Sequence, residues 1–228
     1  MGDFFSLERL IENIPILLRY LPVTFEIVLI ATTAGVVLAI LLAAARIYQI
    51  PVAKWISRVF VSFILGTPIL VQMFIIYYGL PLVLWNGFGI DINGWDKLIF
   101  VLITYALNQS AFLAEIFRSA ILSVPVGQTE AGYSVGLTGV QTFMRIVLPQ
   151  AFRVAIPSFS VNLVGLFQDT SLAFMIGIID IMGKAKLLQT STQHVLECYI
   201  IIAVVFVCIS VAIRLVFRAL DQKLQYGR

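Results

Sequence analysis

Five stretches of the chain contain no Asp, Glu, Lys or Arg and approach the length that a membrane-spanning helix requires. Such a helix needs about 20 mostly apolar residues. The fourth stretch is short because Gln168-Asp169-Thr170-Ser171 interrupts it before the apolar pattern resumes at Leu172. This pattern predicts an all-α integral membrane protein with about five transmembrane helices. The stretches cover residues 27–45, 59–90, 98–114, 154–168 and 198–213.

The first 20 residues follow a different pattern, in which apolar side chains such as Leu7 and Ile11 recur at helical spacing beside charged ones. This pattern is typical of helices that lie at a membrane surface. We therefore expect an N-terminal interfacial segment at residues 1–20, a single five-span domain at residues 21–222 and a tail at residues 223–228.

Composition supports the prediction of a membrane protein, and the distribution of positive charge predicts its orientation in the membrane. Hydrophobic residues make up 61% of the chain and charged residues 12%, whereas soluble domains carry about 25% charged residues. Five spans put the two ends on opposite sides, and with the N-terminus outside, the inner segments hold ten of the 15 Lys and Arg residues. The positive-inside rule therefore predicts the N-terminus outside, the C-terminus in the cytoplasm, and residues 119–150 in the cytoplasm.

The segment EAGYSVGLTGVQTFMRIVLP, residues 130–149, lies between two apolar stretches and is not apolar itself. Gly136 can adopt the left-handed conformation that ends a helix. Thr138 with Gln141 matches a capping box, which begins a second helix. Pro149 disfavours helical geometry at Leu148 and predicts an end or a kink there. The pattern indicates two short helices that meet at a glycine; whether they lie on the bilayer or contact a partner stays open.

Two groups of polar residues fall at membrane depth in the second and third stretches, where such groups usually mark function or helix contacts. Gly66-Thr67-Pro68 predicts either a break, whose backbone lines a cavity or packs against protein, or a simple proline kink. Asn108, Gln109 and Ser110 are too close in sequence to face one way, so some of them face a neighbouring helix. Glu115 belongs either to the same polar belt or to an ion pair with Arg118 at the cytoplasmic end.

The third polar group, Gln168-Asp169-Thr170-Ser171, allows two interpretations. The carboxylate of Asp169 could meet the ammonium group of an amino acid, while the amide and hydroxyl groups could take its carboxylate. Alternatively, Asp169 or Thr170 caps the helix that continues through Leu172.

Several kinds of chemistry are not supported by the sequence. The phosphate-binding pattern Gly-x-x-x-x-Gly-Lys-Ser/Thr does not occur, so we expect no ATP-binding loop of this kind on the chain. There is no candidate nucleophilic triad or Cys–His set, and His194 is the only histidine. We therefore expect no enzyme activity, no catalytic residues, no metal site and no cofactor on this chain.

The segment 130–149 resembles the EAA loop of ATP-binding-cassette (ABC) importer permeases, with Gly132 as the only departure, where that family usually has alanine. GTPILVQ (66–72), the run AEIFRSAILSVPVGQTEAG (114–132) and QDTSL (168–172) resemble the polar amino-acid permeases of this class. The resemblance covers roughly residues 20–222. The motif positions of the loop are Glu130, Ala131, Gly132, Gly136, Ile146, Leu148 and Pro149.

The resemblance implies a type I ABC importer permease fold in the bacterial inner membrane. The loop at residues 124–149 would dock on an ATPase subunit that binds ATP and Mg²⁺. A second permease copy or a related chain, and an extracytoplasmic binding protein, would complete an importer that works by alternating access. The expected coupling residues are Glu130, Ala131, Gly132, Gly136, Leu137, Ile146, Leu148 and Pro149.

The substrate implied by the resemblance is a polar amino acid. GKAKLLQ (183–189) is similar to cystine permeases, which makes cystine the first expectation. Gln168 stands where the family commonly has a lysine, and Leu65 where it often has an arginine. The absence of these two positive charges argues against anionic substrates. The expected substrate pathway comprises Gly66, Thr67, Pro68, Gln72, Asn108, Gln109, Glu115, Gln168, Asp169, Thr170 and Ser171.

Two rival hypotheses come from other classes. The first is a self-contained channel or ion-coupled secondary carrier that uses Asp169 or Glu115, which would leave the 130–149 pattern unexplained. The second is a membrane anchor that keeps a docking loop and tolerates changes at residues 168–171.

Overall fold

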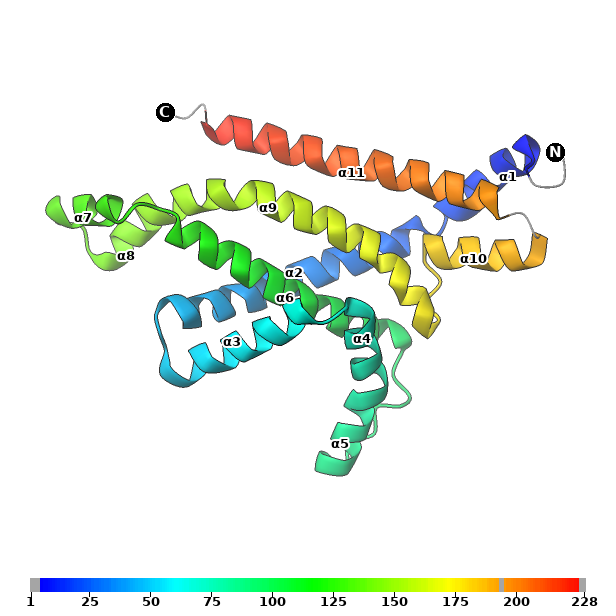
Figure 1. Ribbon diagram of the computed structural model, residues 1–228, viewed down its shortest axis with the longest axis horizontal. Helices are drawn as coiled ribbons and strands as arrows, with labels where there is room; N and C mark the ends of the chain where they lie inside the picture. Colours follow the sequence, from blue (N-terminus) through cyan, green and yellow to red (C-terminus); the bar gives the residue numbers. More distant parts are fainter. Residues whose placement is uncertain (1–4, 193–194, 226–228) are drawn as a thin grey trace.

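The computed structural model describes residues 5–192 and 195–225, and in these residues every regular element is a helix (Figure 1). Five helical segments are long and apolar enough to cross a membrane: Leu21–Ile47, Ile69–Phe88, Lys97–Leu122, Gly139–Ile176 and Leu196–Leu224. The prediction of an all-α protein with about five spans is therefore confirmed. The side of the membrane on which each terminus lies stays a prediction, as do the domain boundaries.

Some consecutive helices are joined without a loop. The joining elements are two short π-helical turns, η1 (Ile75–Gly79) and η2 (Phe143–Val147), and a 3₁₀ segment, η3 (Thr170–Ile176). The α-helices are α1 (Leu7–Leu18), α2 (Leu21–Ile47), α3 (Pro51–Gly66), α4 (Ile69–Phe74), α5 (Leu80–Phe88), α6 (Lys97–Leu122), α7 (Val126–Ser134), α8 (Gly139–Thr142), α9 (Leu148–Asp169), α10 (Ile181–Thr192) and α11 (Leu196–Gln225).

The most extensive contact between two helices of the described chain is that of α2 with α6. Small residues occur at every fourth position of α2, at Ala31, Gly35, Ala39 and Ala43, and the three alanines are almost completely buried. At Gly35 a Cβ atom would lie 2.7 Å from the Cβ of Gln109. Inside a membrane, helices associate through close packing of small residues. This stripe therefore sets the position of α6, which carries several polar residues.

The apolar stretch at residues 59–90 does not form one helix. α3 ends at Gly66, and α4 begins at Ile69 after Thr67 and Pro68, both of which have extended backbone angles. The predicted interruption is confirmed, and the alternative of a simple proline kink is wrong. Beyond the break, α4, η1 and α5 extend away from the bundle as an arm, residues 69–88 (Figure 1).

The fourth span is longer than the sequence pattern predicts. Of the two alternatives predicted at Pro149, an end or a kink, the end is wrong, because the helix passes through η2 and continues into α9 with helical angles at Leu148. The wider π turn precedes the position where proline lacks an N–H and would clash with the preceding turn of a regular helix. The helix from Gly139 therefore runs without interruption to Ile176.

The polar group at residues 168–171 continues this helix instead of starting a new one. Asp169 and Thr170 have helical angles, and Asp169 makes no side-chain cap. The hydroxyl of Thr170 donates to the carbonyl oxygen of Phe167 at 2.9 Å. The hypothesis that Asp169 or Thr170 caps a following helix is therefore wrong, because the chain leaves helical geometry only at Gly177, with φ of 92°.

A smaller core joins α1, α10 and α11, with Leu17, Ile181 and Cys198 fully buried in it. At its edge Asp180 precedes α10 and accepts a hydrogen bond from the N–H of Gly183 at 2.8 Å. Burial raises the pKa of Asp180 from 3.8 to about 6, although the Gly183 N–H and the charge of Lys186 act in the opposite direction. The folded protein therefore binds a proton at Asp180 more tightly than the unfolded chain does.

This shift predicts that the purified protein is more stable at pH 4.5 than at pH 7.5. A raised carboxyl pKa contributes stability that is complete below the unfolded value and is lost as the pH rises through about 6. We expect a difference of about 2–3 kcal/mol, measured as the unfolding temperature in detergent across this range. Asp180→Asn should remove this part of the pH dependence, and an unchanged profile in that variant would contradict the assignment.

Candidate functional site: a protruding loop and a polar groove

The loop between α6 and α9 contains the predicted turn at Gly136, which has φ of 81°. The N–H of Leu137 donates to the carbonyl oxygen of Gly132 at 3.1 Å, and the N–H of Gly136 donates to that of Tyr133 at 3.0 Å. This pair of bonds is the Schellman arrangement that closes a helix on a left-handed residue. The prediction that Gly136 ends the first short helix is confirmed.

The second short helix begins as predicted. The Thr138 hydroxyl oxygen accepts from the N–H of Gln141 at 3.3 Å, and the Gln141 side-chain oxygen accepts from the N–H of Thr138 at 2.9 Å. Both bonds of the capping box are present. This helix, however, is the first turn of the long fourth span, so the loop is joined rigidly to a membrane helix.

The tip of the loop leaves apolar side chains exposed. Val135 and Val140 are 74% and 75% exposed, and Tyr133 is also exposed. Glu130 is exposed as well, and no Cβ contact would arise within 4 Å at Gly136. Figure 1 places α7 and α8 at one end of the bundle, where α11 also ends, while α1 lies at the opposite end. The loop is therefore an open surface, and its two exposed valines were not singled out from the sequence.

Gly132, the position that departs from the family motif, lies in close contact with the side chains of Thr142 and Ile146. A Cβ atom there would lie 2.7 Å from Cγ2 and 2.8 Å from Oγ1 of Thr142, and 3.1 Å from Cδ1 of Ile146. Thr142 is itself buried. Gly132 thus lets α7 pack directly against the start of the fourth span.

This contact predicts that Gly132→Ala destabilises the purified protein by about 1–3 kcal/mol, because an added methyl group has no space. Thr142→Ala removes both nearest atoms, so the double variant should recover most of the loss. The measurement is the unfolding temperature of the wild type, both single variants and the double variant in detergent. Equal unfolding temperatures for the wild type and Gly132→Ala would refute the close-contact argument.

Between α6 and α9 lies a groove of about 520 Å³. Of the expected pathway residues, it brings together Asn108, Gln109 and Asp169. The other eight expected residues, which include Gln168, Ser171 and those of the 66–72 segment, are not among the residues that line it. The full lining consists of Asn108, Gln109, Phe112, Ile116, Pro157, Ser158, Val161, Asn162, Gly165, Leu166 and Asp169.

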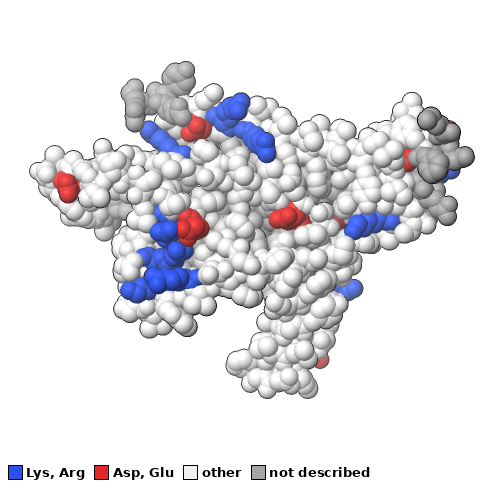
Figure 2. Space-filling model, viewed as in Figure 1, with Lys and Arg blue, Asp and Glu red and all other residues white. Residues whose placement is uncertain are grey.

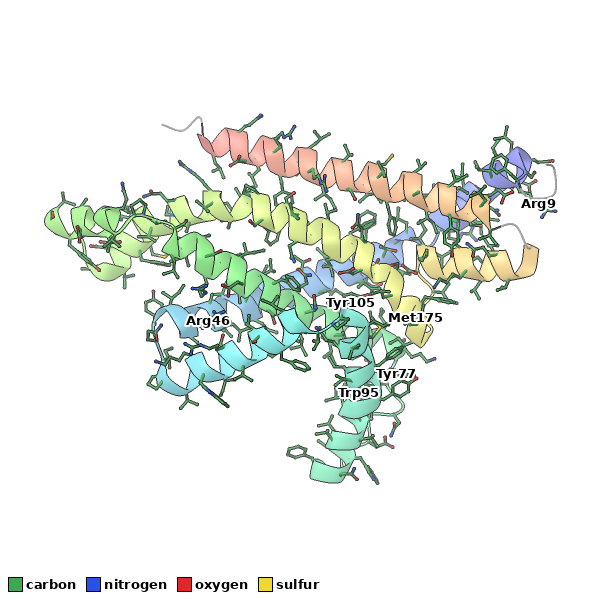
Figure 3. All side chains as sticks on the ribbon, viewed as in Figure 1. Arg9, Arg46, Tyr77, Trp95, Tyr105 and Met175 are labelled. Carbon is green, nitrogen blue, oxygen red and sulfur yellow. The ribbon has the colours of Figure 1, made fainter. Side chains whose placement is uncertain are left out.

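Asp169 provides the one acidic or basic side chain in this lining. Its backbone carbonyl oxygen accepts a hydrogen bond from the hydroxyl of Tyr105, a buried residue of α6 that Figure 3 labels in the middle of the bundle. Within residues 5–192 and 195–225, no side chain forms an ion pair with its carboxylate. The groove therefore offers an unpaired negative charge among mostly apolar walls, where a charge requires a partner.

Glu115 is not among the residues that line the groove. Its carboxylate pairs with Arg46 of α2 at 2.7 Å and with Arg118 at 2.5 Å. The prediction of an ion pair with Arg118 is confirmed, and Arg46 is a partner that sequence spacing does not reveal. Figure 3 shows Arg46 at the end of α2 near the turn into α3. Figure 2 shows that charged side chains form scattered patches on a mostly uncharged surface.

Gln72 and Asn108 join the break after α3 to the groove. The Gln72 amide nitrogen donates to the carbonyl oxygens of Ile64 and Thr67 at 2.8 and 2.9 Å, and to the Thr67 hydroxyl at 3.0 Å. The Asn108 amide nitrogen donates to the Gln72 side-chain oxygen at 3.0 Å. Asn108 is thus both a lining residue and a contact between helices.

In the described part of the chain, no group of three or more His, Cys, Asp and Glu side chains is arranged to hold a metal ion. His194 lies outside the described residues. The site therefore consists of an unpaired carboxylate, side-chain amides and apolar walls, which can bind a small polar molecule without a metal.

Comparison with known proteins adds independent information. Residues 35–226 match the family described as binding-protein-dependent transport system inner membrane component. The L-cystine transport system permease protein TcyL of Bacillus subtilis (strain 168) is 42% identical over 99% of this chain and 94% of its own length. The L-cystine transport system permease protein TcyB of the same organism is 36% identical over 92% of this chain and 87% of its own length.

A solved structure agrees with these matches. The crystal structure of an amino acid ABC transporter with histidines contains a chain that superimposes with a TM-score of 0.84 at 26% identity. The match covers 96% of this chain and 99% of that one. The likeness therefore extends over nearly the whole length of both chains.

Proposed function

Because the chain belongs to the binding-protein-dependent inner membrane components and, among them, to the amino-acid permeases of ABC importers, we propose that it carries L-cystine into the cell by ATP-driven alternating access. The chain is a multi-pass inner membrane protein with the type I permease fold, and its relatives are transport subunits. ATP and Mg²⁺ would bind to separate ATPase subunits, which dock on the loop at residues 124–149.

The loop supports the coupling role by its construction. Its exposed tip carries Glu130 and the apolar side chains of Val135 and Val140, while its base is the first turn of a helix that continues to Ile176. Motion of an ATPase at the tip would therefore move the helix that carries Asp169. Rigid elements of this kind convert movement at one site into movement at another.

The groove is the proposed passage for the amino acid. Its volume of about 520 Å³ falls in the range of small-molecule sites, and it combines Asp169 with side-chain amides. L-cystine is supported by the two relatives named for it and by the GKAKLLQ segment. An extracytoplasmic binding protein would deliver the substrate.

The arm at residues 69–88 supports a complex with a second permease copy or a related chain. Its apolar side chains are largely exposed, with Leu82, Trp85 and Phe88 at 62%, 57% and 73%. Within the bundle it contacts mainly α6 through α4 and η1. A second permease would cover part of this surface, and lipid the rest.

The test of coupling is affinity purification of the chain from its native membranes, followed by mass spectrometry of the proteins that co-purify. We expect an ABC ATPase with the wild type and its loss in Gly136→Glu, because the added side chain occupies the open surface of the tip. Gly89→Glu is the matched control, since Gly89 also has a positive φ, 68°, a Cβ atom there also meets nothing within 4 Å, and it lies far from the loop in sequence. No ATPase with the wild type, or equal recovery with Gly136→Glu, would contradict the coupling role.

The test of substrate is uptake into proteoliposomes that contain the permease, its ATPase and its binding protein. Labelled L-cystine should enter when ATP is supplied and should remain outside without it. Uptake without ATP would support a secondary carrier instead. ATP-dependent uptake of glutamine but not of L-cystine would refute the cystine assignment and leave the importer role intact.

A further inference from the structure

We propose that Gln72 is a positioning residue that holds the Asn108 side chain with its carbonyl oxygen toward the groove, so that Asn108 and Asp169 together bind the ammonium group of the substrate. This inference rests on the proposed function and deepens it. It concerns which end of the amino acid this subunit recognises, and how the break between α3 and α4 serves that recognition.

The first step is the unsatisfied backbone at the break. In a continuous helix the carbonyl oxygen of Ile64 would accept from the N–H of residue 68, but that residue is proline and has no N–H. The N–H of Val71 donates to Pro68, which leaves the carbonyl oxygen of Thr67 without its helical partner. Unsatisfied carbonyl groups at membrane depth are costly. The Gln72 amide nitrogen supplies a donor to both oxygens.

The second step is the direction of the Gln72 amide. Backbone carbonyl oxygens accept and cannot donate, so the group that faces Ile64 and Thr67 must be the NH₂ of Gln72. Its side-chain oxygen therefore points the other way, toward Asn108. Gln72 is 3% exposed, so water does not compete for this arrangement. The break after α3 thus determines which atom Gln72 presents to α6.

The third step is the orientation of the Asn108 amide group. The Gln72 oxygen needs a donor, and the Asn108 NH₂ supplies it at 3.0 Å. The other atom of the Asn108 amide, its carbonyl oxygen, makes no hydrogen bond with any described residue of the chain. Asn108 lines the groove, so this oxygen is the acceptor left for a ligand.

The fourth step is the chemistry that the two acceptors share. Tyr105, one turn before Asn108 on α6, bonds to the backbone oxygen of Asp169, and this contact holds the Asn108 turn beside Asp169. A neutral carbonyl oxygen and an unpaired carboxylate together favour a donor with positive charge. Lys and Arg are absent from the lining, so the groove offers no cation to the carboxylate of an amino acid. The geometry selects the ammonium end.

The experiment measures binding of L-cystine and of N,N′-diacetyl-L-cystine, which lacks free ammonium groups, to the purified permease–ATPase complex without its binding protein. The wild type should prefer L-cystine, and Gln72→Met should reduce this preference by about tenfold. Gln49→Met makes the same change in the exposed turn between α2 and α3 and should keep the wild-type preference. Wild-type preference in Gln72→Met would overturn the inference.

A double-variant comparison separates positioning from general destabilisation. If Gln72 acts through Asn108, then Gln72→Met should have no further effect on the preference in an Asn108→Ala background. A further loss there would overturn the positioning role. Failure of the wild type to bind L-cystine would instead refute the proposed function itself.

A second pair of variants keeps the inference testable if Gln72→Met does not fold. Asn108→Asp loses the donor to Gln72 but retains an acceptor on the groove side, whereas Asn108→Leu loses both. The preference for L-cystine over its diacetyl derivative should persist in the first variant and be lost in the second. Equal preferences in both variants would overturn the inference.

Discussion

Asp169→Asn is expected to lower the rate of ATP-dependent amino-acid uptake by about a hundredfold without loss of the assembled complex. Asp169 is the one charged side chain that lines the groove, and a hydrogen bond to a charged group contributes about 1.5–3 kcal/mol. Asparagine preserves the size of the side chain, and the Tyr105 hydroxyl can still donate to the same backbone oxygen. The measurement is the initial uptake rate in proteoliposomes, normalised to the amount of intact complex.

Asp96→Asn is the matched control for this prediction. Asp96 caps the start of α6 by accepting from the N–H of Leu98 at 2.8 Å, and asparagine caps helices equally well. This variant should transport at close to the wild-type rate. Uptake by Asp169→Asn within twofold of the wild type would show that the substrate's ammonium group is recognised elsewhere.

Gly35→Leu is expected to prevent formation of the folded subunit. Even a single Cβ atom at Gly35 would lie 2.7 Å from the Cβ of Gln109 and 3.3 Å from the backbone nitrogen of Ser110. Leucine would force α2 and α6 apart, and with them the polar residues of the groove. We expect the variant to elute from size-exclusion chromatography as aggregate, while Gly35→Ala folds but is less stable by about 1–3 kcal/mol.

Gly87→Leu provides the control, since nothing lies within 4 Å of a Cβ atom at Gly87 in α5. This variant should elute as the wild type does. A single symmetric peak for Gly35→Leu would mean that α2 and α6 can separate without loss of the fold, and that the close packing at Gly35 does not hold the bundle together.

Local signals in the sequence were sufficient for the loop. Gly136 and the Thr138–Gln141 pair act on backbone groups within a few residues of themselves, so the turn and the second helix start could be predicted without knowledge of the rest of the chain. The number of spans could be predicted for a similar reason, because each span depends on its own length and composition.

Predictions that depended on a single local rule were less successful. Pro149 was expected to end or kink the fourth helix, and Asp169 or Thr170 was one candidate to cap a following helix. In the structure, the proline follows a π turn and remains within the helix, and the helix continues through the polar group without a break. Between these two positions, α9 packs against α6 and α11, and tertiary packing of this kind outweighs the local preference of single residues.

The candidate site could be predicted from the sequence only in part. The sequence by itself determined the spans, the loop with its glycine turn, and which polar residues fall at membrane depth, because these features depend on neighbours in the chain. Only the tertiary structure decided that Asn108 and Asp169 share a groove, that Glu115 pairs with Arg46, and that Gln72 joins the α3–α4 break to Asn108. Each of these contacts joins different helices. The relative position of these helices depends on the close approach of α2 and α6 at Gly35 and on the hydrogen bond from Tyr105 to Asp169.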